Sequence, residues 1–150
     1  MQLNRFTDYG LRVLMYLHAS QPGERTTIGQ IAERFGVPRN HLDKVVNRLV
    51  KLGWVDSRPG RSGGLLLAQR TAALRLGDVL RELENHPALI NCAEPPCPLS
   101  GNCHLNRALG TALNSFYEQL NQYSLPDLVA PPTAMLIQRL QARPPLRATT

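Results

Sequence analysis

The sequence contains no apolar run near the length of about 18 residues that a membrane-spanning helix needs. Its first residues also lack the pattern of a secretion signal. Asp8 and Arg12 interrupt the apolar positions, and no cleavage motif of small residues follows. We therefore expect a cytoplasmic protein without a membrane partner.

The motifs of common enzyme active sites are absent as well. The sequence has neither the Gly-x-Ser-x-Gly turn of serine hydrolases nor the His-Glu-x-x-His pair of zinc proteases, and it has no glycine-rich nucleotide-binding loop. We therefore assign no catalytic residue and expect that the protein is not an enzyme.

Acidic residues are scarce relative to basic ones, with 11 against 17 and a formal net charge of +6. Residues 27–61 carry +4 of this excess, because they contain seven basic and three acidic side chains. The basic ones are Arg34, Arg39, Lys44, Arg48, Lys51, Arg58 and Arg61. Such clustering is typical of a surface that faces nucleic-acid phosphates, although a solvated helix face would show the same charge.

Helical spacing of apolar residues predicts helices over residues 4–19, 28–35 and 39–52. The last two are joined by a short turn around Gly36, which is the helix-turn-helix pattern. The third helix has an apolar face of Leu42, Val45, Val46 and Leu49. Its opposite face lacks Glu and offers side chains that contact phosphates and adenine edges. We therefore interpret it as a recognition helix rather than an ordinary surface helix, with DNA contacts from Arg39, Asn40, Lys44, Asn47, Arg48 and Lys51.

A β-hairpin is predicted directly after this helix. Residues 54–58 and 65–68 have strand character, and the glycine-rich segment between them favours a turn. A hairpin in this position is the wing of a winged helix, with Arg58 and Arg61 at its tip for contact with phosphates or a narrow minor groove. The fold class predicted is mainly α with a small β-wing.

The C-terminal half contains a predicted helix over residues 76–85 and a longer one over residues 104–122. The longer helix carries a continuous apolar stripe, which indicates a dimerisation helix; packing within one chain is the alternative. The stripe is Leu105, Ala108, Leu109, Ala112, Leu113, Phe116, Leu120 and Tyr123. We expect a winged helix-turn-helix domain at 1–70, a cysteine loop and dimerisation helix at 71–130, and a weakly ordered tail at 131–150, with one or two helical turns near 135–140.

The three cysteines, Cys92, Cys97 and Cys103, lie within twelve residues of an irregular, proline-rich stretch. Clustered thiols in a reducing cytosol favour metal or redox chemistry over disulfides. Structural zinc sites normally use short paired spacings and four protein ligands, whereas iron–sulfur clusters accept longer, uneven spacings. A fourth ligand could come from His104, His86 or a carboxylate elsewhere in a dimer, and three incidental buried cysteines are the alternative.

Several segments together resemble the iron–sulfur winged-helix repressors, a family that contains IscR and the nitric-oxide-sensing NsrR proteins. They are residues 1–14, 37–42, 63–64 and 76–79 and the cysteine loop, and the resemblance extends over residues 1 to about 130. The opening segment and the cysteine spacing favour the NsrR branch. IscR-like members have a histidine ligand three residues after the last cysteine, where this sequence has Asn106.

The resemblance implies a homodimeric repressor that binds double-stranded operator DNA. It implies a 4Fe–4S cluster held by the three cysteines and by Asp8 of the partner subunit, although Asp8 alone would be expected to cap or ion-pair within its own helix. Nitrosylation of that cluster by nitric oxide would derepress genes for nitric oxide detoxification. The alternatives are an IscR-like regulator that responds to iron–sulfur supply and a cysteine-rich redox or enzyme-accessory protein whose basic stretch is incidental.

Overall fold

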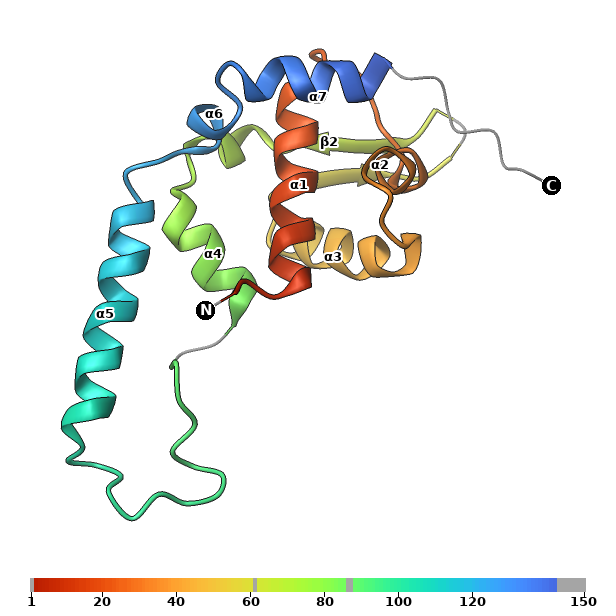
Figure 1. The fold of residues 1–150 in the computed structure, drawn as a ribbon. Coiled ribbons are helices and arrows are strands. Elements are labelled where there is room, and N and C mark those ends of the chain that lie inside the picture. Colours follow the sequence, from red (N-terminus) through yellow and green to blue (C-terminus); the bar gives the residue numbers. More distant parts are fainter. Residues whose placement is uncertain (1, 61, 86–87, 143–150) are drawn as a thin grey trace.

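The structure is a computed structural model that describes residues 2–60, 62–85 and 88–142. It is mainly helical with one two-stranded antiparallel sheet, as the sequence predicts (Figure 1). In chain order the elements are α1 (Arg5–Ala19), α2 (Ile28–Phe35), α3 (Arg39–Lys51), β1 (Val55–Arg58), β2 (Gly64–Leu67), the 3₁₀ helix η1 (Gln69–Ala73), α4 (Leu76–Glu84), α5 (His104–Leu120), α6 (Leu125–Leu128) and α7 (Thr133–Ala142). None of the helices in these ranges has both the length and the apolar character needed to cross a bilayer.

The helix-turn-helix is confirmed at α2 and α3, and local capping explains its boundaries. The Thr27 hydroxyl accepts a hydrogen bond from the Gln30 amide, and the Gln30 side chain accepts one from the Thr27 amide, which closes a capping box at the start of α2. Gly36 ends α2 in the left-handed conformation, with φ of 62°. The predicted inner face of α3 is buried throughout, at Leu42, Val45, Val46 and Leu49.

The wing is also confirmed, and it is attached to the entry of α2. β1 pairs with β2 from Val55 opposite Leu67 to Arg58 opposite Gly64. Thr26 adds a single bridge on the other side of β2, where its backbone exchanges hydrogen bonds with Leu65 at 3.3 and 2.8 Å. β2 is therefore bonded to β1 on one side and to Thr26, just before the start of α2, on the other.

α1 lies at the centre of the fold, with the helix-turn-helix and wing against one side and α4 against the other (Figure 1). α4 approaches α1 closely at Gly10, where a Cβ atom would lie 2.8 Å from Leu83 Cδ1. The main core includes residues of α4, α6 and α7 as well as the winged helix, namely Val79, Leu83, Leu125, Val129 and Ile137. It therefore extends across the expected domain boundary at residue 70.

The C-terminal segment differs from the weakly ordered tail expected from the sequence. α7 is longer than the expected one or two turns, and Ile137 inserts into the main core. Gln141 Nε2 donates to the Tyr16 carbonyl at 3.3 Å and to Ser20 Oγ at 3.0 Å, which fixes α7 to the end of α1. These tertiary contacts stabilise a helix that its own sequence pattern only weakly indicates. Residues 143–150 of the expected tail lie outside the described residues.

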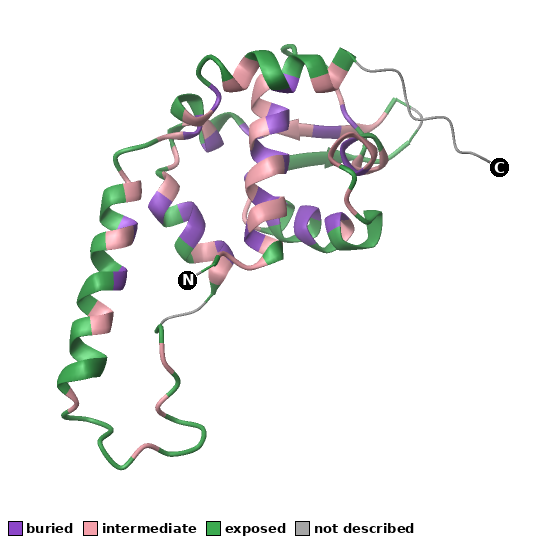
Figure 2. Cartoon of the chain, viewed as in Figure 1, coloured by how far each residue is buried: buried purple, intermediate pink, exposed green. Residues whose placement is uncertain are grey.

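α5 and the cysteine loop project from the rest of the molecule (Figures 1 and 2). α5 packs only part of its apolar stripe within the chain, in a small cluster where Leu113 and Tyr117 contact Leu80 of α4. Leu109, Phe116 and Leu120 are half-buried, and Leu105 at the loop end is 61% exposed. Packing within one chain therefore covers the stripe incompletely.

Candidate nucleic-acid interface and cysteine loop

The outer face of α3 presents every side chain that the sequence predicts as a DNA contact on this helix. All of them are exposed: Arg39, Asn40, Lys44, Asn47, Arg48 and Lys51. The buried face opposite fixes the helix against the core, so these cations and carboxamides are presented on a rigid element. Such a surface can bind backbone phosphates and read base edges in a major groove.

The C-terminal end of α3 is held by an arginine that sequence analysis did not identify. Arg70 of η1 donates from Nε to the carbonyl of Gly53 at 2.8 Å. Gly53 has a positive φ of 69°, and a Cβ atom there would lie 1.6 Å from Arg70 Nη2. A cation at this position also suits the negative end of the helix dipole. Arg70 therefore holds the C-terminal end of α3 without belonging to its exposed face.

Among the predicted DNA contacts that the structure describes, Arg48 alone pairs with an acid. Its guanidinium forms an ion pair with Glu82 of α4, and the two side chains remain 43% and 42% exposed. Sequence analysis did not identify this contact. The ion pair joins the edge of α3 to α4, the helix that leads into the cysteine loop.

The wing presents Arg58 at the end of β1, where the side chain is exposed. Arg61, the second predicted wing contact, lies outside the described residues. The turn is tight because a Cβ atom on Gly63 would lie 2.2 Å from the Arg58 carbonyl oxygen. Arg58 is thus held at the start of a sharp reversal, on the same domain as the outer face of α3.

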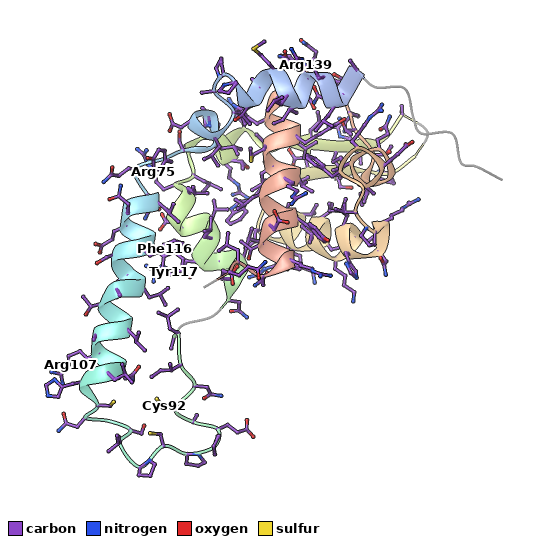
Figure 3. All side chains as sticks on the ribbon, in the orientation of Figure 1. Arg75, Cys92, Arg107, Phe116, Tyr117 and Arg139 are labelled. Atoms are coloured by element: carbon purple, nitrogen blue, oxygen red, sulfur yellow. The ribbon has the colours of Figure 1, made fainter. Side chains whose placement is uncertain are left out.

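The cysteine loop holds three free thiols, all half-buried, at Cys92, Cys97 and Cys103 (Figure 3). The loop is folded by backbone hydrogen bonds from the Cys97 amide to the Cys92 carbonyl and from the Ser100 amide to the Cys97 carbonyl, each 3.0 Å long. The Asn91 side chain accepts from the Ala93 amide at 2.9 Å. Cys103 is the N-cap residue of α5, so the loop and the long helix meet at a thiol.

Soft thiolate donors of this kind fit an iron–sulfur cluster chemically. In one subunit, however, these thiols are not gathered into a complete metal site. Within the part of the chain that the structure describes, no group of three or more His, Cys, Asp or Glu side chains lies close enough to hold a metal ion. His86, one of the weighed fourth ligands, is outside the described residues, and His104 is the exposed first residue of α5.

Asp8, the fourth ligand implied by the resemblance, is engaged within α1 in this structure. Arg12 Nε and Nη2 donate to its two carboxylate oxygens at 2.9 and 2.8 Å. The Asp8 side chain is nevertheless 41% exposed, so another subunit could reach it. Its role as a ligand stays a prediction.

The root of the cysteine loop is attached to the start of α1 by a contact that sequence analysis missed. Glu84, the last residue of α4, accepts hydrogen bonds from the Asn4 amide at 2.9 Å and from Asn4 Nδ2 at 3.0 Å. The Asn4 side chain also caps α1 by accepting from the Thr7 amide at 2.8 Å. One asparagine therefore ties the loop-bearing helix to the helix that carries Asp8.

α4 and α5 are joined by reciprocal polar contacts. The Asn121 side chain accepts from the Asp78 amide at 2.9 Å and donates to the Asp78 carboxylate at 3.0 Å. Further along, the Arg81 guanidinium lies 4.4 Å from the centre of the Tyr117 ring. Burial raises the pKa of Tyr117, and nearby Glu84 adds to that rise while Arg81 opposes it. α4 thus contacts α1, α3 and α5 through separate side chains.

Comparison with known proteins decides what kind of molecule carries these features. The sequence model of one family, described as "Rrf2: Iron-dependent Transcriptional regulator", matches residues 3–131. The chain belongs to the Rrf2 family. It is accordingly a transcriptional regulator and not an enzyme, and DNA binding, which Rrf2 regulators share, accords with the basic face of α3.

Three solved structures are similar to this Rrf2 chain. CymR of B. subtilis, the global cysteine regulator, is 24% identical, with a TM-score of 0.69 over 87% of this chain and 97% of that chain. The oxidized form of Staphylococcus aureus CymR is 22% identical, with a TM-score of 0.67 over 87% of this chain and 97% of that one. T. potens IscR is 22% identical, with a TM-score of 0.65 over 97% of this chain and 93% of that one. At these identities the likeness shows the fold alone, and it confirms the predicted winged helix.

Proposed function

We propose that this Rrf2 regulator is a cytoplasmic, homodimeric repressor that binds operator DNA in a cluster-dependent way and releases it in response to nitric oxide. The observation that carries the proposal is the loop with three half-buried free thiols, rooted on a helix that also contacts the recognition helix. The iron dependence in the description of the family agrees with a thiolate site.

DNA binding is proposed for the outer face of α3 in the major groove, with the wing on the backbone or minor groove. The exposed cations and carboxamides of α3 support this placement, as does the exposed Arg58. Arg61 is proposed to act beside Arg58. The ion pair of Arg48 must open before Arg48 reaches a phosphate.

A dimer is proposed through α5. The apolar stripe of this helix is only partly covered within one chain, and Rrf2 regulators are typically dimeric. Two copies joined by α5 would present two α3 helices to a near-palindromic operator.

The cluster site is proposed at Cys92, Cys97 and Cys103, completed by Asp8 of the partner subunit. When bound, a 4Fe–4S cluster supplies iron atoms that nitric oxide can attack. The three thiolates would hold it on a loop rooted at Glu84, and the carboxylate would have to leave Arg12 to reach it. A change in the loop would then reach α1 through Asn4 and α3 through Arg48. Such coupling requires that the two states of the loop differ in DNA affinity.

The deciding experiment combines spectroscopy with DNA binding. Protein purified anaerobically is used to select duplexes from a randomised library. Absorption, iron and sulfide content and affinity for the selected duplex are then measured before and after nitric oxide. We expect iron and sulfide with a visible absorption band, loss of that band with nitric oxide, and at least tenfold weaker DNA binding, which corresponds to about 1.4 kcal/mol. Equal affinity in both states would contradict the proposal.

Two sets of variants separate the parts of the proposal. Lys44→Ala with Asn47→Ala should abolish binding of the selected duplex while leaving iron content unchanged. Replacing any of the three cysteines by serine should remove the iron. A cluster that survives nitric oxide while DNA binding follows iron–sulfur supply would instead indicate an IscR-like regulator.

A further inference from the structure

We infer that Arg5 of α1 and Lys44 of α3 together bind one backbone phosphate of the DNA, so that the first turn of α1 belongs to the DNA interface. This inference rests on the proposed function, which places α3 against a duplex. It adds Arg5 as a contact that the sequence did not indicate and assigns a shared ligand to Lys44.

The site is a small hollow where α1 crosses α3. It has a volume of about 180 Å³ and is lined by Arg5, Phe6, Tyr9, His41, Lys44 and Val45. Small-molecule sites usually span roughly 300–1,000 Å³, so this hollow suits a phosphate group better than a metabolite. The Tyr9 and His41 rings stack with their centres 6.3 Å apart and form one wall. This stacked pair of rings bridges α1 and α3, the two helices that carry the cations.

The positive charge of the hollow is not balanced by nearby acids. Arg5 and Lys44 are exposed, and among the described residues no carboxylate lies within ion-pair distance of either. Asp8, one turn after Arg5, has both oxygens occupied by Arg12. Asp43 precedes Lys44 directly, and adjacent residues do not face each other on a helix. The hollow therefore attracts an anion.

The position of Arg5 in α1 strengthens this assignment. Arg5 is the first residue of a helix of 15 residues, at its positive end. The helix dipole disfavours a cation there and favours an anion. An arginine in this place does not stabilise the helix, whereas it adds to the attraction that the helix end exerts on a phosphate.

The location of Lys44 identifies the source of the phosphate as DNA. Lys44 lies on the outer face of α3, in the middle of the exposed residues that are proposed to enter the major groove. Recognition helices are flanked by backbone phosphates, which carry positioning contacts rather than sequence contacts. A phosphate held between α1 and α3 at this point would lie on the strand that borders the groove.

The test is a double-variant cycle on binding of the selected duplex, with affinity measured from about 50 to about 200 mM salt. Arg5→Ala should weaken binding roughly five- to tenfold near 0.1 M salt, and equally for unrelated duplexes. Arg5→Lys, which keeps the charge, should restore most of the loss. Because both side chains hold one phosphate, Arg5→Ala with Lys44→Ala should weaken binding less than the product of the single effects. The double variant should reduce the slope of log affinity against log salt by about 1.

Arg139→Ala is the matched control, because Arg139 is exposed on α7 at the end of α1 remote from α3 (Figures 1 and 3). It should bind DNA as the unmodified protein does. An Arg5→Ala variant that matches this control, or independent losses that reduce the slope by about 2, would overturn the inference. If the unmodified protein selects no duplex, or if Lys44→Ala has no effect, the proposed function itself fails.

Discussion

Arg48 can bind either of two partners, and both are negatively charged. In the structure it pairs with Glu82, and in the proposed complex it binds a DNA phosphate. The two contacts use the same guanidinium, so the carboxylate and the phosphate compete for it. Partly exposed ion pairs contribute about 0.2–1 kcal/mol, which sets the scale of this competition.

Glu82→Gln should therefore raise DNA affinity by about 1.5- to fivefold, because Arg48 no longer has to leave a carboxylate. The increase should be largest in low salt, since a further phosphate contact steepens the salt dependence. Fluorescence anisotropy with the selected duplex measures the affinity and its dependence on salt. Glu118→Gln, at an exposed position of α5, is the control. A fall in affinity would instead show that Glu82 orients Arg48 for DNA.

Residue-level prediction from sequence succeeded where a pattern repeats along one helix. The buried and exposed faces of α3 are visible as a period, so the side chains on each face could be predicted. The partners Arg70–Gly53, Arg48–Glu82 and Asn4–Glu84 are separated by 17, 34 and 80 residues. Such pairs leave no periodic signal, because only the packing of α4 and η1 brings them together.

At the scale of elements, the joint between α4 and α5 depends on one glycine. A Cβ atom on Gly77 would lie 2.0 Å from the Tyr117 carbonyl oxygen and 2.5 Å from Asn121 Oδ1. Gly77→Ala should force the two helices apart and lower the free energy of unfolding by about 1–3 kcal/mol, as overpacking does. Thermal unfolding measures the loss, and iron content reports whether the loop still functions.

Gly29→Ala gives the comparison for this prediction. Gly29 lies in α2, where an added Cβ would have its nearest neighbours at 3.9 Å. Alanine is favoured over glycine in a helix by roughly 1 kcal/mol, so this variant should be as stable as the unmodified protein or more so. If the Gly77→Ala and Gly29→Ala variants are equally stable, the packing of α5 against α4 does not depend on the close approach at Gly77.

The cap of the short helix α6 should stabilise the protein in a way that depends on pH. The Ser124 hydroxyl and amide donate to the Asp127 carboxylate at 2.5 and 2.7 Å, and these hydrogen bonds lower the pKa of Asp127. A lowered pKa in the folded state means that the cap stabilises above the ordinary carboxyl pKa of about 3.9 and is lost as the pH falls through the lowered value. Ser124→Ala should raise the pKa of Asp127 in an NMR titration, whereas Ser115→Ala on α5 should not.

α7 shows why the length of one element was underestimated from the sequence. Its segment follows two prolines and ends in a stretch rich in proline and arginine, which favours a loop. The helix forms because Ile137 enters the core and Gln141 binds the end of α1. Neither contact has a counterpart in local spacing. The helices α1 to α5 were predicted because their own apolar periods or caps indicate them.

At the scale of the whole molecule, the exposed apolar part of α5 leads us to expect that two chains associate through this helix. Leu105 is 61% exposed and lies near the cysteine loop. Leu105→Glu should place a charge in the proposed dimer interface and shift the protein toward monomer, which analytical ultracentrifugation detects. Loss of the partner should also lower cluster retention, because Asp8 is proposed to come from the partner subunit.

Leu136→Glu is the control for this prediction, since Leu136 is 55% exposed on α7. It should leave the dimer intact. If both variants remain dimeric, the subunits associate through another surface. The cysteine spacing predicts three donors of the proposed site, and among the described residues no group of three or more metal-binding side chains is gathered. In the proposed function a second subunit completes the site, which the sequence of one chain cannot indicate.

The placement of α4 has a consequence for how such regulators diversify. A chimera joined at residue 70 would surround α4 with foreign neighbours at Asn4, Gly10 and Arg48. These positions must therefore change in concert with α4, and in the proposed function the DNA-binding part and the cluster-binding part are not exchanged as separate modules. Asn40 and Asn47 are exposed on α3 and are not among the positions that have to change together with α4. In the proposed function, new operators can be acquired by substitutions at these two positions while the proposed response to nitric oxide is inherited unchanged.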